Sequence, residues 1–172
     1  KQGLEYLNQL QIYQVSEFME LDAATHRNLE LTETMREKIK RGTLLWVLDS
    51  TKTSMGARLL KQWVEKPLID PDKIKQRLYA VEELVNDLML RDEVRSVLDG
   101  IYDIARIVSR ISLGTVSPKD LIALKLSLTR LPDLEYQLSK MHSGLFCDMK
   151  KRLDIMEDVR TLLENAIADE PP

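Results

Sequence analysis

Apolar side chains recur at intervals of three and four residues from about residue 54 onward, and few windows alternate apolar with polar positions. Residues three and four apart share one face of an α-helix, so this spacing is typical of amphipathic helices. The chain is therefore predicted to be all-α, an irregular multi-helix bundle preceded by a short non-helical N-terminal segment.

Two helices are predicted between residues 55 and 88. The first covers 55–65, with Thr53 or Ser54 as its cap, and it ends before Pro67. The second begins at residues 70–72, because a proline at the first helical position and an acidic first turn favour a helix start. Its apolar positions step by four and three and are predicted to form one buried stripe: Ile74, Leu78, Val81, Val85 and Leu88.

The same spacing continues between Val94 and Ile111, where Gly100 leaves open whether the segment is one helix or two. A strong start signal follows at residues 117–120, with Ser117 as cap, Pro118 at the first helical position and Asp120 three residues after the cap. The helix that begins there is predicted to bury one face, made by Leu121, Leu124, Leu128 and Leu131.

The C-terminal part is predicted to hold two further helices. Pro132 restarts a helix that runs to a turn at 142–144, and a single last helix then covers 146–167. The first twenty residues follow a different pattern, with a helix-like start and a more extended continuation. We therefore place a domain boundary near Glu20.

Composition narrows the class of protein. Of 172 residues, 44% are hydrophobic and 31% are charged, which is typical of a globular chain and not of a disordered one. The formal charge of −3 gives no bulk attraction to nucleic acid phosphates. A single cysteine, Cys147, excludes an intramolecular disulfide and favours a reducing, cytoplasmic setting. Apolar runs are too short to predict a membrane span.

No motif predicts a catalytic, cofactor or metal site in this chain. The sequence has neither G-x-x-x-x-G-K-[ST] nor G-x-G-x-x-G, so nucleotide binding by a glycine-rich loop is not expected. Its two histidines, His26 and His142, are far apart, and cysteine pairs are absent. Asp22 lies four residues before His26 and would share its helix face, but a solvated pair is favoured over an oriented base.

Charged residues form one notable row. Asp103, Arg106 and Arg110 stand at i, i+3 and i+7, so on a helix they lie along one face beside the apolar residues. This row is either an anchor within the molecule or plain surface, and the sequence leaves the two readings open. The basic clusters at 38–41 and 150–152 are interpreted as solvated runs, because no aromatic residues alternate with them.

Four stretches, in this order, resemble the core domain of the MutS family of DNA mismatch repair proteins. The first is MELDAATHRNLEL at 19–31, and the second is GTLLWVLDSTKTSMGARLLKQWVEKPL at 42–68. The third combines R-L-x-A-V-E-x-L within 74–84 with D-I-x-R-I-x-S-R-I-x-L and S-P-K-D-L within 103–128. The fourth is LLENAIADEPP at 162–172.

The resemblance implies a fragment of a longer protein. Residues 1–18 would be the tail of the connector domain, and 19–172 the first half of the MutS core, ending before the lever helices and the clamp. The complete protein would be a cytoplasmic, homodimeric, DNA-dependent ATPase that uses ATP and Mg, binds mismatched duplex DNA and recruits a MutL-type repair protein. This segment would link the clamp and connector to the ATPase domain, with no catalytic, cofactor, metal or identified DNA-binding residue of its own and no membrane contact.

The matched motifs supply a set of structural and interdomain candidates. Gly56 is expected to let its helix approach a neighbour closely, and the charged row is expected to fix helices to one another. The full set is Asp22, Arg27, Asn28, Gly56, Arg58, Asp103, Arg106, Arg110, Ser117, Pro118 and Asp120.

Two other functions compete with this prediction. One is a self-contained helical protein-interaction module, and the other is a small helical enzyme that uses His26 and Asp22. A core fragment is expected to leave apolar helix faces uncovered, whereas a self-contained module would have a polar surface all round.

Overall fold

The computed structural model describes residues 17–168, and within them the regular structure is helical, with one isolated bridge between extended segments. The prediction of an all-α chain is confirmed. The helices are α1 (Ala23–Asn28), α2 (Leu44–Leu48), α3 (Ser54–Glu65), α4 (Pro71–Asn86), α5 (Leu88–Asp99), α6 (Ile104–Ser112), α7 (Pro118–Thr129), α8 (Leu131–Ser139), α9 (Gly144–Arg152) and α10 (Glu157–Ala166).

The chain forms two compact units. The first holds the described residues up to Ser50 together with Arg58–Pro71, and the second holds Thr51–Ala57 and the residues from Asp72 onward. The helix α3 therefore has its first turn in the second unit and its remainder in the first. The predicted connector tail, 1–18, lies almost wholly outside the described residues, so that assignment stays a prediction.

In the first unit, short segments are joined by backbone hydrogen bonds. Phe18 and Leu68 form an antiparallel bridge, and Met19 N–H donates to the carbonyl of Pro67 at 2.8 Å. Leu45 of α2 is buried, and its N–H donates to the carbonyl of Leu31, which is also buried. Leu31 and Leu45 are the buried apolar residues among the described residues of this unit.

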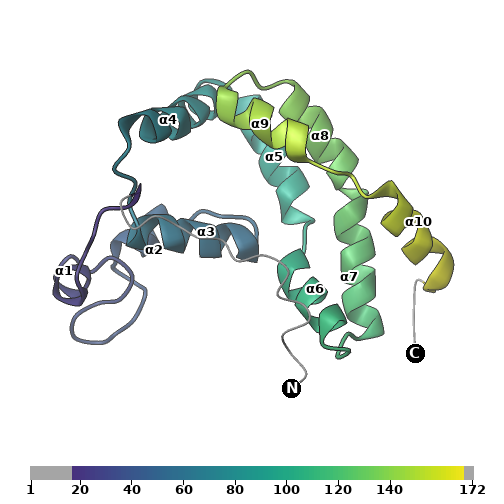
Figure 1. Cartoon of the computed structure of the whole chain (residues 1–172), viewed down its shortest axis with the longest axis horizontal. Coiled ribbons are helices and arrows are strands. Elements are labelled where there is room, and N and C mark those ends of the chain that lie inside the picture. Colours follow the sequence, from purple (N-terminus) through teal and green to yellow (C-terminus); the bar gives the residue numbers. More distant parts are fainter. Residues whose placement is uncertain (1–16, 169–172) are drawn as a thin grey trace. The chain divides into compact units, whose positions relative to one another are not determined.

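The core of the second unit surrounds α7. Helices α6, α8 and α10 all contact α7, α5 packs on α8, and α8 packs on α9; Figure 1 shows α7 between α6 and α10. The largest buried cluster consists of Ile101, Ile107, Leu124, Leu128, Leu131 and Leu163. A smaller cluster holds Leu90, Leu138 and Met141. The predicted apolar face of α7 is thus confirmed.

One buried hydroxyl in this core has two hydrogen-bond partners. Ser127 is fully buried, and its Oγ accepts the N–H of Tyr102 at 2.9 Å while donating to the carbonyl of Ala123 at 2.7 Å. A buried polar group without partners costs stability, so these two bonds make the site acceptable in an apolar cluster. The bond from Tyr102 also joins α7 to the segment between α5 and α6.

The question left open at Gly100 is decided in favour of two helices. The helix α5 ends at Asp99, with Gly100 as its C-cap, and α6 begins after Asp103. A Cβ on Gly100 would lie 2.8 Å from Nε of Arg130, so α5 ends where another side chain approaches the backbone closely.

The prediction of a single last helix over 146–167 is wrong. The helical segment breaks after Arg152, and α10 begins only at Glu157, following Met156 with its φ of 49°. Leu153 and Ile155 both pack against the main core cluster. Residues two apart share a face in extended backbone but not in a helix, so extension lets both reach the core.

The buried stripe predicted for α4 is also wrong. Ala80 is the buried residue of α4, and Arg77, Glu83 and Leu84 are half-buried around it. The five apolar residues of the predicted stripe are exposed, namely Ile74, Leu78, Val81, Val85 and Leu88. The helix packs against the rest of the second unit through its other side, where Leu84 contacts the cluster that contains Leu90.

Candidate functional site

The helix α7 begins with a complete capping box. Ser117 Oγ accepts the N–H of Asp120 at 3.2 Å, and Asp120 Oδ2 accepts the N–H of Ser117 at 3.0 Å. Pro118 occupies the first turn, where no backbone donor is needed. These bonds satisfy donors that a helix start leaves free, so the predicted start signal is confirmed.

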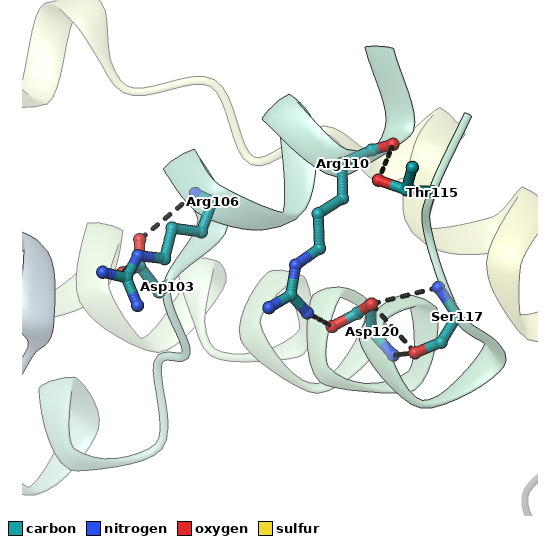
Figure 2. A network of polar contacts seen from close by, with 6 residues as sticks. All are labelled: Asp103, Arg106, Arg110, Thr115, Ser117 and Asp120. Atoms are coloured by element: carbon teal, nitrogen blue, oxygen red, sulfur yellow. Dashed lines mark hydrogen bonds and ion pairs between the residues drawn. The ribbon is translucent and has the colours of Figure 1, made fainter. Parts of the chain in front are cut away.

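Arg110 connects α6 to this cap. Its guanidinium forms an ion pair with Asp120 Oδ1, the carboxylate oxygen that the Ser117 N–H does not use. Figure 2 shows Arg110 extending from α6 to Asp120 at the start of α7. The carbonyl of Arg110 also accepts the N–H of Thr115 at 2.9 Å, which closes the turn between the helices. One arginine therefore fixes both sides of the α6–α7 corner.

The electrostatics of the corner favour an ionised Asp120. Hydrogen bonds from the backbone and hydroxyl of Ser117 lower the pKa of Asp120 against an opposing effect of burial, and the positive charge of Arg110 adds a smaller lowering effect. A carboxylate that accepts several bonds is stabilised in its charged form. The ion pair is consequently present throughout the neutral pH range.

The structure separates the three members of the charged row. Asp103 is the N-cap of α6, because its Oδ1 accepts the N–H of Arg106 at 3.2 Å. The Arg106 side chain is 75% exposed and lies beside Asp103, as Figure 2 shows. Arg110, in contrast, forms an ion pair with Asp120 at the start of α7. The row is thus an anchor at one end and surface at the other.

The motif residues in the first unit have similar structural uses. Asp22 is the N-cap of α1, and its Oδ1 accepts the N–H of Thr25 at 2.6 Å. Hydrogen bonds from the hydroxyl and the backbone N–H of Thr25 lower the pKa of Asp22 against an opposing effect of burial, and Ala24 and His26 add smaller lowering effects. The carboxylate is engaged as a cap, which gives no support to the enzyme reading. Arg27 and Asn28 end the same helix.

Gly56 does not have the predicted neighbour. The space that a Cβ would occupy is bounded by Thr53 Oγ1 at 3.1 Å and by the side chain of Thr51. Its N–H donates to Thr53 Oγ1 at 3.0 Å. The glycine therefore fits against the turn that precedes its own helix, and not against a second helix. Arg58, also in α3, is exposed.

Sequence reasoning missed Glu83, which joins α4 to the start of α9. Its Oε1 accepts the N–H of His142 at 2.6 Å, and its Oε2 accepts the N–H of Ser143 at 2.9 Å. Ser143 is the N-cap of α9 but makes no side-chain cap bond of its own. A carboxylate from a helix some 60 positions earlier thus caps α9, and no local sequence signal indicates such a contact.

The pKa of Glu83 reflects this role. Partial burial alone would raise the pKa, but the hydrogen bonds from Ser143 and His142 outweigh it and lower the pKa overall. A second distant contact lies nearby, where Lys140 Nζ donates to Glu93 Oε2 at 2.8 Å. The hydrogen bond to Glu93 raises the pKa of Lys140. These pairs fix α4 to α9 and α5 to the end of α8.

The described residues offer no obvious reaction centre. Within 17–168, no group of three or more His, Cys, Asp or Glu side chains is placed to hold a metal ion. An open hollow of about 560 Å³ beside α1 is lined by charges of both signs, including Arg27, Lys38, Glu33 and Glu65. None of the helices in the described part is long and apolar enough to cross a bilayer.

Comparison with known proteins identifies the family. The model of MutS domain III matches residues 24–172. This chain belongs to the MutS domain III family. The resemblance that the motifs indicated is thereby confirmed, and the reading as an unrelated, self-contained interaction module is not favoured. Among the motif residues, Asp22 caps α1, and Asp103, Arg110, Ser117 and Asp120 cap or join helices in the second unit.

Proteins named DNA mismatch repair protein MutS match the chain from end to end. That of Ruminiclostridium cellulolyticum is 48% identical over 172 residues, which are 100% of this chain and 20% of the relative. Those of Clostridium perfringens and Alkaliphilus oremlandii are 46% and 44% identical over 171 residues, 99% of this chain and 19% of each relative. The chain thus spans about a fifth of the length of the curated MutS relatives it matches.

Proposed function

We propose that this chain is the helical core segment of a longer MutS polypeptide that acts in DNA mismatch repair. In that polypeptide it serves as a rigid linkage between the connector and clamp on one side and the ATPase domain on the other. The observation that carries the proposal is the use of the family's motif residues. Asp103, Ser117, Asp120 and Arg110 cap and join helices, which is the chemistry of a rigid support and not of a reaction centre.

The complete polypeptide is proposed to bind mismatched duplex DNA and to hydrolyse ATP with Mg in a separate domain. It would form a homodimer, act with a MutL-type repair protein and work in the cytoplasm. The names of the relatives support mismatch repair, and the even balance of charge in this segment supports a DNA grip located elsewhere. ATP, Mg and DNA would thus meet residues outside this chain.

The test uses the complete MutS polypeptide with Arg110→Ala, and with Arg106→Ala as the matched control. Removing Arg110 frees the α6–α7 corner, so the factor by which ATP changes affinity for a G·T duplex should fall about two- to tenfold. DNA affinity without nucleotide and nucleotide affinity without DNA should change little. Binding titrations with and without ATP measure all of these quantities.

The control separates the anchor from general loss of charge. Arg106 is exposed and pairs within its own helix, so Arg106→Ala should leave the coupling unchanged. Arg110→Lys should recover part of it, because a lysine keeps the charge without the planar fork of an arginine. Unchanged coupling in Arg110→Ala, or an equal loss in Arg106→Ala, would contradict a linkage that runs through this corner.

A further inference from the structure

Gly100, the C-cap of α5, has a backbone conformation that does not require glycine. Its φ and ψ are −89° and 3°, which residues with a side chain also adopt. Gly42 and Gly114 differ, because their φ values of 92° and 67° lie in the left-handed region that favours glycine. The reason for a glycine at position 100 must therefore lie in the space around it.

The space beside Gly100 is taken by the side chain of Arg130. A Cβ at position 100 would lie 2.8 Å from Nε of Arg130, 3.4 Å from its Cγ and 3.5 Å from its Cδ. Non-bonded heavy atoms attract best at roughly 3.5 to 4.0 Å, so the first of these distances would be repulsive. The three atoms are consecutive along the side chain, so rotating the guanidinium group alone would not relieve the contact. The stem of Arg130 thus lies against the backbone of Gly100.

This contact connects two bends of the chain. Gly100 lies between α5 and α6, and Arg130 lies between α7 and α8 as the residue that caps both. The residues that follow them, Ile101 and Leu131, are both buried in the main core cluster. The two bends therefore share a buried cluster as well as the contact itself.

A third segment is attached at the same place. Asp99, the residue before Gly100, forms an ion pair with Lys52, whose Nζ lies 3.3 Å from Oδ1 of Asp99. Lys52 belongs to the segment Thr51–Ala57, which includes the first turn of α3 and is part of the second unit. Met55 of that segment packs against the main core cluster. The end of α5 is thus where three parts of the second unit meet.

We propose that Arg130 and Gly100 form a joint that makes the α5–α6 bend and the α7–α8 bend move as one. Glycine is required at position 100 because only a residue without a side chain leaves room for the stem of Arg130. In the complete MutS polypeptide, this joint carries part of the coupling between nucleotide binding and DNA binding. That last step rests on the proposed function and adds a second connection to the one at Arg110, whereas the steric requirement does not depend on it.

The first experiment measures the steric requirement by urea unfolding of the 172-residue chain. Gly100→Ala should raise the equilibrium constant for unfolding about five- to thirtyfold, because the new methyl group and the stem of Arg130 compete for one space. Gly144→Ala is the matched control. A Cβ at Gly144 would meet nothing within 4 Å, so this variant should leave the constant unchanged or lower it.

The decisive comparison repeats Gly100→Ala in an Arg130→Ala background. Arg130 is exposed, so Arg130→Ala alone should change stability little. In that background Gly100→Ala should be neutral or lower the unfolding constant up to about fivefold, because alanine restricts the unfolded chain more than glycine does. The same increase in both backgrounds, or no increase in the parent chain, would overturn the proposal. If Gly100→Ala alone does not fold, the double variant must fold for the proposal to stand.

The second experiment asks whether the joint carries coupling. In the complete MutS polypeptide, Arg130→Ala should reduce the factor by which ATP changes affinity for a G·T duplex about two- to tenfold, and Gly144→Ala should not. The double variant should regain stability relative to Gly100→Ala but not regain coupling, because the contact is still missing. A purely structural role would restore both together and would overturn this step, as would unchanged coupling in Arg130→Ala.

The Arg110→Ala variant separates this proposal from the proposed function. Coupling that falls in Arg110→Ala but not in Arg130→Ala would refute the joint and leave the proposed linkage standing. Coupling that falls in neither variant would refute both. The unfolding experiments on the 172-residue chain decide the steric requirement in either case.

Discussion

Helices α4 and α7 belong to the same compact unit, yet their apolar residues have opposite environments. In α7, which carries apolar residues on several faces, Leu124 and Leu128 are buried in the main core cluster. In α4, the apolar residues form a clean stripe and are exposed, while a small residue, Ala80, makes the buried contact. A regular apolar stripe in the sequence therefore does not by itself show that the stripe is buried within this chain.

The largest effect is expected in α7. Leu128 is 2% exposed, so Leu128→Ala removes a side chain from a packed cluster and should lower the free energy of unfolding by about 2 to 5 kcal/mol. Leu126→Ala and Leu78→Ala, at residues 45% and 59% exposed, should each cost less than about 1 kcal/mol. Urea unfolding of the three variants measures the difference. A cost for Leu78→Ala close to that of Leu128→Ala would erase the contrast between the helices.

A smaller effect is expected where α4 is fixed by a polar contact. Glu83→Gln removes the charge that accepts two N–H groups at the start of α9, and it should cost about 1 kcal/mol at pH 7 because the site is partly open to water. Glu82→Gln, at an exposed position of the same helix, is the matched control and should be near neutral. Chemical unfolding at pH 7 compares them, and equal stabilities of the two variants would contradict a special role for Glu83.

The pH dependence follows from the lowered pKa of Glu83. Its pKa is lower in the folded state than the ordinary value of 4.5, so its contribution is fully present above that value. The contribution is lost as the pH falls through the lower folded pKa. The difference in stability between the parent chain and Glu83→Gln should therefore be constant near neutrality and narrow below about pH 4.5. A gap that persists unchanged at pH 2 would show that Glu83 acts by packing alone.

The third expected effect is confined to the first turn of α7. Ser117→Ala removes the hydroxyl that caps the N–H of Asp120 and should cost about 1 kcal/mol. Ser112→Ala, which loses only a bond back to the carbonyl of Val108 in α6, should be near neutral. Thermal unfolding measures both. If Ser117→Ala were also neutral, the buried face of α7 alone would determine where this helix begins.

Local signals in the sequence predicted the starts of α3, α4, α7 and α8 to within one or two residues. The signal at Ser117, Pro118 and Asp120 depends on residues three positions apart, and the structure has the cap that they specify. The proline at 71 likewise marks the start of α4. The order of motifs also indicated the family, because each motif is a short continuous stretch.

Contacts between distant residues could not be predicted in this way. Glu83 reaches α9 across about 60 positions, and nothing near it in the sequence distinguishes it from Glu82. The break between α9 and α10 depends on Leu153 and Ile155 both reaching a core that earlier helices build. Arg106 and Arg110 look equivalent in the sequence, but the turn at Thr115 brings Asp120 to only one of them.

The sequence by itself determined that this chain is helical, where the helices with a proline or a cap at their start begin, and which family it belongs to, because caps, prolines and short motifs act over a few residues. The tertiary structure decided which faces are covered, which charges join helices and where the last helix breaks. Those outcomes depend on which distant surfaces meet, and the burial of a side chain is a property of both surfaces together.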